Sequence, residues 1–183
     1  MRSPDKTGWS SSALRLFTAL SLGLAAPTEE VMATTVVTAP GEQAAEPAGF
    51  RFQDVDGKTV RLDNFRGQWV VVNFWAHWCP LCWPEVPELN ALNALEDVAV
   101  IGVAMDYGPD VMAVYQAIKR QDMRYGTQVL GGNRISLDAA YHQVGPVSFY
   151  PTTYIFNPKG GRHARINGPL SIKRFMAVTR DER

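Results

Sequence analysis

The fold of this chain is decided by residues 69–82, which read WVVVNFWAHWCPLC. Residues 69–75 form a nearly continuous apolar run rich in valine, which is typical of a central strand buried on both faces. The run leads to Cys79 and Cys82, which are separated by two residues. Apolar residues then recur at a spacing of three, so we expect a helix over residues 80–95. The sequence therefore predicts a strand, a C-x-x-C motif and a helix in succession.

The two cysteines have different expected roles because of their places on this helix. Cys79 would lie at the helix N-terminus, where free backbone N–H groups and the helix dipole favour a thiolate. Cys82 would lie one turn further on, close enough to attack a mixed disulfide formed on Cys79. We expect Cys79 to be the exposed nucleophile and Cys82 the shielded thiol. The alternatives are half of a metal site, or a structural disulfide, which would close too short a loop to stabilise much.

Composition excludes several classes of protein. The 183 residues carry no formal net charge, so nothing marks a nucleic-acid partner. Hydrophobic residues make up 46%, enough for a globular core and too few for a protein with many membrane spans. With two cysteines in all, the chain is not a disulfide-stapled scaffold and lacks the ligands of a tetrahedral zinc site. Its paired glycines lack the spacing of a phosphate or dinucleotide motif, so we expect neither a cofactor nor a metal.

The N-terminal region is expected to be an export segment. Basic residues precede an apolar run over residues 16–26, which suits a signal peptide and is short for a membrane span. We expect residues 1–33 to be a signal peptide, with an uncleaved N-terminal anchor as the alternative. Residues 34–49 are rich in Ala, Thr, Pro and Glu and are expected to be a flexible linker, followed by one domain over residues 50–183. This domain would lie in the periplasm or on the extracytoplasmic face of a membrane, where disulfides persist.

The remaining pattern predicts an α/β domain with a central mixed sheet. Alternating apolar residues on either side of Asp56-Gly57 predict an N-terminal β-hairpin. Further strands are expected at residues 98–105, 127–130, 152–156 and 163–167, the last as an edge strand. Further helices are expected at residues 111–121, 136–142 and 172–179.

Two stretches resemble a known family. The run NFWAHWCPLC at residues 73–82, followed by Glu85, resembles the active site of the TlpA/ResA/DsbE thioredoxin-like proteins. The run YPTTYIF at residues 150–156 resembles their cis-proline loop and the strand after it. The resemblance covers about residues 50–180. It implies a thioredoxin-like fold with an extra strand and helix between the C-x-x-C helix and the cis-proline loop.

The resemblance also implies roles for individual residues. Pro151 would be cis and face the cysteines, which leaves the backbone of Tyr150 free to pair with a substrate strand. Glu85 would exchange a proton with Cys82, whereas without the resemblance it is simply a solvated helix glutamate. Asn73 stands where plain thioredoxin has a buried acid.

Four residues are expected to contact the substrate: Trp78, Pro80, Leu81 and Tyr150. The aromatic residues Trp83 and Tyr150 depart from the family pattern and leave the identity of the substrate open.

The function implied is thiol-disulfide exchange on protein substrates. The chain would be a monomeric reductase of disulfides in exported proteins, with apocytochrome c as one candidate substrate and a membrane thiol-disulfide protein as electron donor. The alternative is a copper metallochaperone, which would need Cys79, Cys82 and a distant ligand such as His163. Thioredoxin-fold copper proteins usually space their cysteines more widely. His77, two residues before Cys79, is expected to be exposed to solvent.

Overall fold

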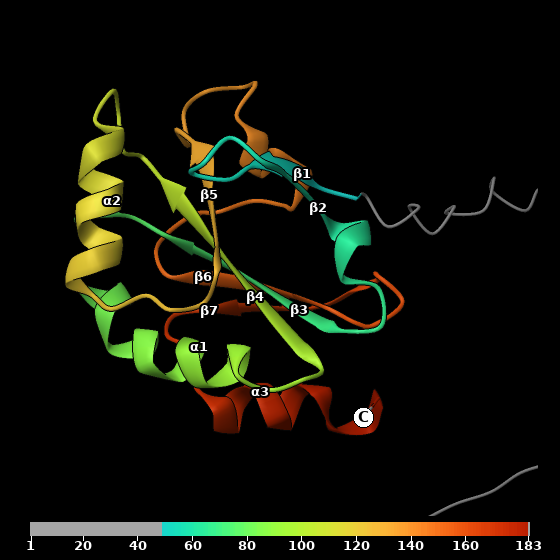
Figure 1. Cartoon of the computed structure of the whole chain (residues 1–183). Helices are drawn as coiled ribbons and strands as arrows, with labels where there is room; N and C mark the ends of the chain where they lie inside the picture. The colour runs from blue at the N-terminus through green and yellow to red at the C-terminus, as the bar shows by residue number, and fades with distance from the viewer. Residues whose placement is uncertain (1–48, 183) are drawn as a thin grey trace, which may run out of the picture. The chain divides into compact units, whose positions relative to one another are not determined.

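The computed structural model describes residues 49–182 (Figure 1). The expected leader over residues 1–33, and all but the last residue of the expected linker over residues 34–49, lie outside the described residues. Within residues 49–182, no helix is both long enough and apolar enough to cross a membrane.

The central sheet of the described region has five strands in the order β5-β4-β3-β6-β7. The strands are β3 (Trp69–Trp75), β4 (Val98–Met105), β5 (Thr127–Gly132), β6 (Thr152–Phe156) and β7 (Arg162–Asn167). The first three in the chain are parallel, whereas β6 and β7 are antiparallel additions. Every residue of β3 and β4 is buried, as expected for strands that are covered on both faces. The α/β class and the mixed sheet are confirmed.

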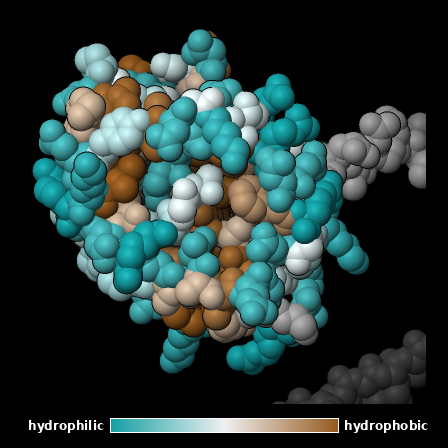
Figure 2. Space-filling view, viewed as in Figure 1, coloured by the Kyte–Doolittle hydropathy of each residue, from teal (hydrophilic) through white to brown (hydrophobic). Residues whose placement is uncertain are grey.

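The expected N-terminal hairpin is also present. Strands β1 (Arg51–Gln53) and β2 (Thr59–Arg61) are antiparallel and face each other across a turn in which Gly57 has a φ of 82°. Such a positive φ is readily adopted by glycine. In Figure 1 the hairpin lies in the upper part of the view near β5, while α1 (Val86–Asn93) and α3 (Ile172–Thr179) lie at the bottom. Hydrophilic residues cover most of the face drawn in Figure 2, and apolar residues show in patches between them.

The helix expected over residues 80–95 is divided into two parts. A 3-10 helix, η2 (Pro80–Glu85), comes first, and the α-helix α1 begins only at Val86. Two prolines explain the division, because a proline has no N–H to donate within a helix. Pro84 lies inside η2, and Pro87 falls in the first turn of α1, where a proline is tolerated.

The next two helices lie further along the chain. The helix α2 (Val111–Arg120) agrees with the sequence, and Asp110 caps it by accepting a hydrogen bond from the Ala113 amide. The helix expected over residues 136–142 is a short 3-10 helix instead, η3 (Ala140–Gln143). The backbone of Ala139 is extended, with a ψ of 135°, so a longer helix cannot form.

Helix α1 holds the cysteine-bearing segment against the sheet. Its buried residues Val86, Leu89 and Leu92 are each at most 3% exposed, and α1 packs on β4 and beside α3. Burying one such side chain contributes roughly 1.5–3 kcal/mol relative to leaving it in water. The C-x-x-C motif is therefore attached to a rigid element.

The topology brings four segments to one end of the sheet, the end at which β3, β4 and β5 finish. Because β3, β4 and β5 are parallel, their carboxyl ends lie at the same end of the sheet, and the antiparallel β6 begins there. Cys79 follows β3, Asp106 follows β4, Arg134 follows β5 and Pro151 precedes β6. Residues far apart in the sequence can therefore act together.

The two outer edges of the sheet differ. The β5 edge is partly covered by the hairpin, since Asp54 forms a β-bridge with Val129 and the Val55 amide donates to the Gln128 carbonyl at 3.0 Å. Strand β7 is the other edge, and its sequence includes Arg162 and Arg165. The expectation that this strand lies at an edge is confirmed.

Candidate active site

Cys79 and Cys82 form a disulfide at the start of η2. Their Cα atoms are 5.5 Å apart, and Cys79 directly precedes η2. Both residues are buried, Cys79 at 3% and Cys82 at 1% exposure. In the disulfide form both cysteines are therefore buried, and the expectation of an exposed Cys79 thiol, which concerns the reduced protein, stays a prediction.

A shallow groove nevertheless reaches Cys79. It has a volume of about 240 Å³ and is lined by Trp78, Cys79, Pro80, Leu81, Arg134, Phe149 and Tyr150. Trp78, Leu81 and Phe149 are 51%, 65% and 46% exposed, so apolar surface surrounds the opening. Cys82 is not part of the lining, which leaves Cys79 as the sulfur that a partner in this groove would approach. The four residues expected to contact substrate all line the groove.

Glu85 lies on the side of the motif away from solvent. It is 1% exposed, its Oε1 accepts a hydrogen bond from Asn73 Nδ2 at 2.9 Å, and its Oε2 accepts one from the Leu170 amide at 2.7 Å. Burial raises the pKa of Glu85 to about 7, although both hydrogen bonds oppose the rise. In a 3-10 helix, residues three apart eclipse each other, so Glu85 and Cys82 share one side of η2. A solvated glutamate, the reading without the family resemblance, is wrong.

Asn73 links Glu85 to the strand that follows the cis proline. Its Nδ2 donates to Glu85 and also to Thr153 Oγ1 at 3.0 Å, and the residue is 1% exposed. Such pairing is what a polar side chain in the core requires. The sequence placed Asn73 in the core but did not predict that it pairs with Glu85.

The Tyr150–Pro151 peptide bond is cis, as the resemblance implied. The loop is fixed from both sides: Thr152 Oγ1 donates to the Phe149 carbonyl at 2.8 Å, and the Gly168 amide donates to the Pro151 carbonyl at 2.9 Å. The Tyr150 residue is only 7% exposed.

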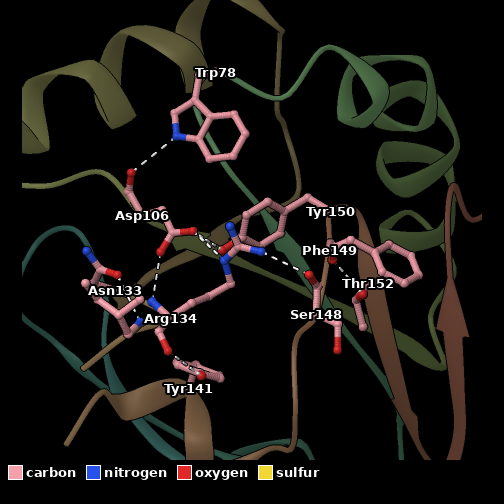
Figure 3. Close-up of polar contacts among 10 residues, drawn as sticks. Trp78, Asp106, Asn133, Arg134, Tyr141, Ser148, Phe149, Tyr150 and Thr152 are labelled. Atoms are coloured by element: carbon pink, nitrogen blue, oxygen red, sulfur yellow. Dashed lines mark hydrogen bonds and ion pairs between the residues drawn. The ribbon is translucent and has the colours of Figure 1, made fainter. Parts of the chain in front are cut away.

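A hydrogen-bond network centred on Asp106 connects Tyr150, Arg134 and Trp78 (Figure 3). Asp106 Oδ2 accepts hydrogen bonds from Tyr150 Oη at 2.8 Å and from Arg134 Nε at 2.6 Å. Its carbonyl accepts one from Trp78 Nε1 at 3.3 Å. The Arg134 guanidinium also lies 4.6 Å from the centre of the Tyr150 ring. Although burial raises the pKa of Asp106, hydrogen bonds from Arg134 and Tyr150 outweigh this and leave it below its ordinary value.

Sequence reasoning missed both Asp106 and Arg134. The signal that would have found them is their position after strands β4 and β5, beside the strand that leads to Cys79. Residues that follow neighbouring parallel strands lie at the same end of the sheet as the cysteines.

The histidines do not form a site with the cysteines. The His163 ring lies 5.0 Å from the ring of Trp69, which begins β3, whereas Cys79 comes after the end of that strand. Within residues 49–182, no group of three or more His, Cys, Asp or Glu residues is placed to hold a metal ion. His163, the ligand that the copper alternative gave as its example, therefore lies at the far end of β3 from the cysteines and cannot join them in a metal site. His77 is half-buried rather than exposed, and its Nδ1 finds no hydrogen-bond partner among the described residues.

Comparison with known proteins assigns the family. The profile of the AhpC/TSA family matches residues 40–161, well over half of the chain. The chain belongs to the AhpC/TSA family. Among curated relatives, the thiol-disulfide oxidoreductase ResA of Bacillus subtilis is 31% identical over 119 residues. This match covers 64% of the present chain and 63% of ResA, so the chain spans a little less than two thirds of that relative's length.

Solved structures of similar shape confirm the thioredoxin-like fold. A putative thioredoxin from Neisseria meningitidis superposes with a TM-score of 0.60 at 24% identity, covering 73% of this chain and 86% of that protein. StoA from Bacillus subtilis superposes with a TM-score of 0.58 at 22% identity, covering 74% of this chain and 98% of StoA.

Proposed function

We propose that this AhpC/TSA family member is an extracytoplasmic thiol-disulfide oxidoreductase that reduces disulfides in exported proteins. The observation that carries the proposal is the Cys79–Cys82 disulfide, open to a groove at Cys79 and backed by the buried Glu85. The similarity to ResA of Bacillus subtilis, a thiol-disulfide oxidoreductase by name, supports it.

The reaction begins with the protein in its dithiol form. The Cys79 thiolate attacks one sulfur of the substrate disulfide in the groove, and the substrate S–S bond breaks. A disulfide between Cys79 and the substrate forms, and the other substrate sulfur leaves as a thiolate that takes up a proton.

The second step releases the substrate. Cys82 loses its proton and attacks the Cys79 sulfur, which breaks the mixed disulfide and frees the second substrate thiol. The substrate has then gained two electrons and two protons, and the protein holds the Cys79–Cys82 disulfide seen in the structure.

Glu85 serves the second step as proton acceptor. Its pKa of about 7 means that both protonation states are accessible near neutral pH. Asn73 and the Leu170 amide hold the carboxylate in place on the side of η2 that it shares with Cys82.

The cellular setting follows from the same proposal. Residues 1–33 export the chain as a signal peptide or hold it as a membrane tether, and a membrane thiol-disulfide protein returns it to the dithiol form. The protein acts as a monomer, and apocytochrome c is the candidate substrate that would place it in cytochrome c maturation. Fractionation of cells that express the full chain, with the mass of the mature protein, tests the location and the cleavage.

Three proteins test the chemistry: the wild type, Cys79→Ser and Cys82→Ser, each pre-reduced and mixed with a peptide that contains one disulfide. The wild type should reduce the peptide, Cys79→Ser should be inert, and Cys82→Ser should stop as a mixed disulfide detected by its mass. Alkylation of the reduced wild type should label Cys79 before Cys82.

The opposite labelling order would exchange the roles of the cysteines. A Cys79→Ser protein that still reduces the peptide would refute the mechanism.

A further inference from the structure

Asp106 follows β4 and forms hydrogen bonds to several residues near the cysteines, through both its side chain and its main chain. Its side chain accepts hydrogen bonds from the Arg134 amide at 2.8 Å, from Arg134 Nε and from Tyr150 Oη. Its carbonyl accepts one from the Trp78 indole, and its amide donates to the Gly132 carbonyl at 3.0 Å. One residue thus joins the segment before Cys79, the loop after β5 and the loop before the cis proline (Figure 3).

The backbone of Asp106 is itself unusual. Its φ is 49°, in the left-handed region that residues other than glycine seldom adopt. Such a conformation persists only where the surroundings determine it. Here the side-chain and main-chain hydrogen bonds of Asp106 supply that determination, and its side chain is only 14% exposed.

The partners of Asp106 are the walls of the groove beside Cys79. Trp78 and Tyr150 line it, and their rings meet edge to face with centroids 5.8 Å apart. Arg134 also lines the groove, and its Nη1 donates to the Ser148 carbonyl at 3.1 Å. Asp106 itself is not part of the lining.

The size of the groove indicates what it accepts. At about 240 Å³ it is smaller than the roughly 300–1,000 Å³ of a typical small-molecule site. It suits a side chain of a polypeptide, and its aromatic walls suit an apolar one.

We propose that Asp106 is a positioning residue that holds Trp78 and Tyr150 as the walls of a specificity groove, which accepts an apolar side chain next to the substrate's disulfide cysteine. This rests on the proposed function and adds the substrate feature that is selected. Asp106 acts on binding through its two aromatic partners, and Arg134 braces it. It takes no part in the exchange of sulfur atoms.

The variant Asp106→Asn tests the side-chain part of this role, toward Tyr150 and Arg134, because the main-chain carbonyl that accepts from Trp78 stays in place. Asparagine tolerates the left-handed backbone and keeps the shape, but it has one carbonyl oxygen and so cannot reproduce both acceptor atoms of the carboxylate. Pre-reduced wild type and variant are each mixed with a disulfide peptide that carries phenylalanine beside each cysteine, and separately with 2-hydroxyethyl disulfide. Single-turnover rates against concentration give a maximal rate and a half-saturating concentration.

For the peptide, we expect the half-saturating concentration to rise about tenfold while the maximal rate stays within about twofold. For 2-hydroxyethyl disulfide, which has no side chain to place in the groove, we expect the rate to stay within about twofold. The matched control is Asp63→Asn, which weakens two exposed ion pairs, with Arg61 and Arg66, and should change neither reaction.

A double-mutant cycle with Tyr150→Phe tests the route. The phenylalanine keeps the ring and removes the hydroxyl that donates a hydrogen bond to Asp106. We expect the combined variant to be no more than about twofold worse on the peptide than the worse single variant, whereas Asp63→Asn with Tyr150→Phe should show the product of the separate effects.

Two results would overturn the inference: an unchanged half-saturating concentration for the peptide, or an equal loss on both disulfides. A non-covalent measurement separates it from the proposed function. With Cys79 and Cys82 both changed to Ser, Asp106→Asn should weaken the affinity for the phenylalanine peptide about tenfold, and unchanged affinity would again refute the inference. A wild type inactive on both disulfides would instead refute the proposed function.

Discussion

Glu85 is a carboxylic acid in the core, and its contacts predict how stability depends on pH. In the unfolded chain its pKa is near the ordinary 4.5, whereas in the fold burial raises it to about 7. Between these two values the folded protein holds more protons than the unfolded one. Stability should therefore fall as pH rises from about 4.5 to about 7, with about 3.5 kcal/mol as the order of magnitude at roughly 1.4 kcal/mol per pKa unit.

The variant Glu85→Gln should lose this dependence, because glutamine does not titrate. The measurement is urea denaturation of the oxidised proteins at about pH 4.5 and about pH 8, with the difference between the wild type and the variant as the readout. Equal pH slopes for the two proteins would contradict the assignment.

At this scale the sequence predicted some residues and missed others. Cys79, Cys82 and the cis Pro151 stand in local motifs, so a short window is enough to find them. Asp106 and Arg134 are ordinary polar residues in sequence. Their importance arises only when parallel strands bring them to the edge that holds the cysteines.

Elements of this fold are also constrained by close packing, most tightly where β5 meets β4. A Cβ added at Gly131 would lie 2.4 Å from Met105 Sδ and 2.6 Å from Val103 Cγ1. Both neighbours are buried, so they have little room to move. Gly131→Ala should therefore destabilise the protein by about 1–3 kcal/mol.

The control is Gly126→Ala, at the position just before β5, where an added Cβ would meet nothing within 4 Å. It should leave stability unchanged or raise it slightly, because alanine reduces the entropy of the unfolded chain. Urea denaturation of both variants checks the prediction. Equal stabilities would show that β5 shifts to accommodate the methyl group.

The strands whose residues are all buried were predicted accurately. Strands β3, β4 and β6 agree with the sequence at both ends, because each is a continuous apolar or β-branched run. The cysteine helix differed because Pro84 and Pro87 change the hydrogen bonding of its first turns. The short helix before Tyr150 differed because apolar periodicity does not reveal an extended residue such as Ala139.

For the whole molecule, the residues within the C-x-x-C motif and the carboxylate of Glu85 predict the direction of electron transfer. A strong oxidant needs a highly stabilised thiolate, yet Pro80 and Leu81 within the motif bring neither charge nor a side-chain donor. Glu85 behind Cys82 adds negative charge when ionised and opposes a second anion. The protein should therefore be a reductant, with a potential below about −200 mV on a scale where the strong oxidant lies near −120 mV.

Equilibration with a glutathione buffer of known ratio, followed by mass spectrometry, measures this potential. A value near that of the strong oxidant would assign the protein as an oxidase. The fold and the roles of the two cysteines would remain as they are.

The exposed edge of the sheet at β7 affects whether the protein associates with itself at high concentration. A free sheet edge offers unpaired backbone groups to any neighbouring chain, and two such edges can join into a growing ribbon. The hairpin partly shields the β5 edge, whereas on β7 the positive charges of Arg162 and Arg165 repel the same strand of a second molecule. Concentrated salt, which screens that repulsion, should therefore promote self-association through β7.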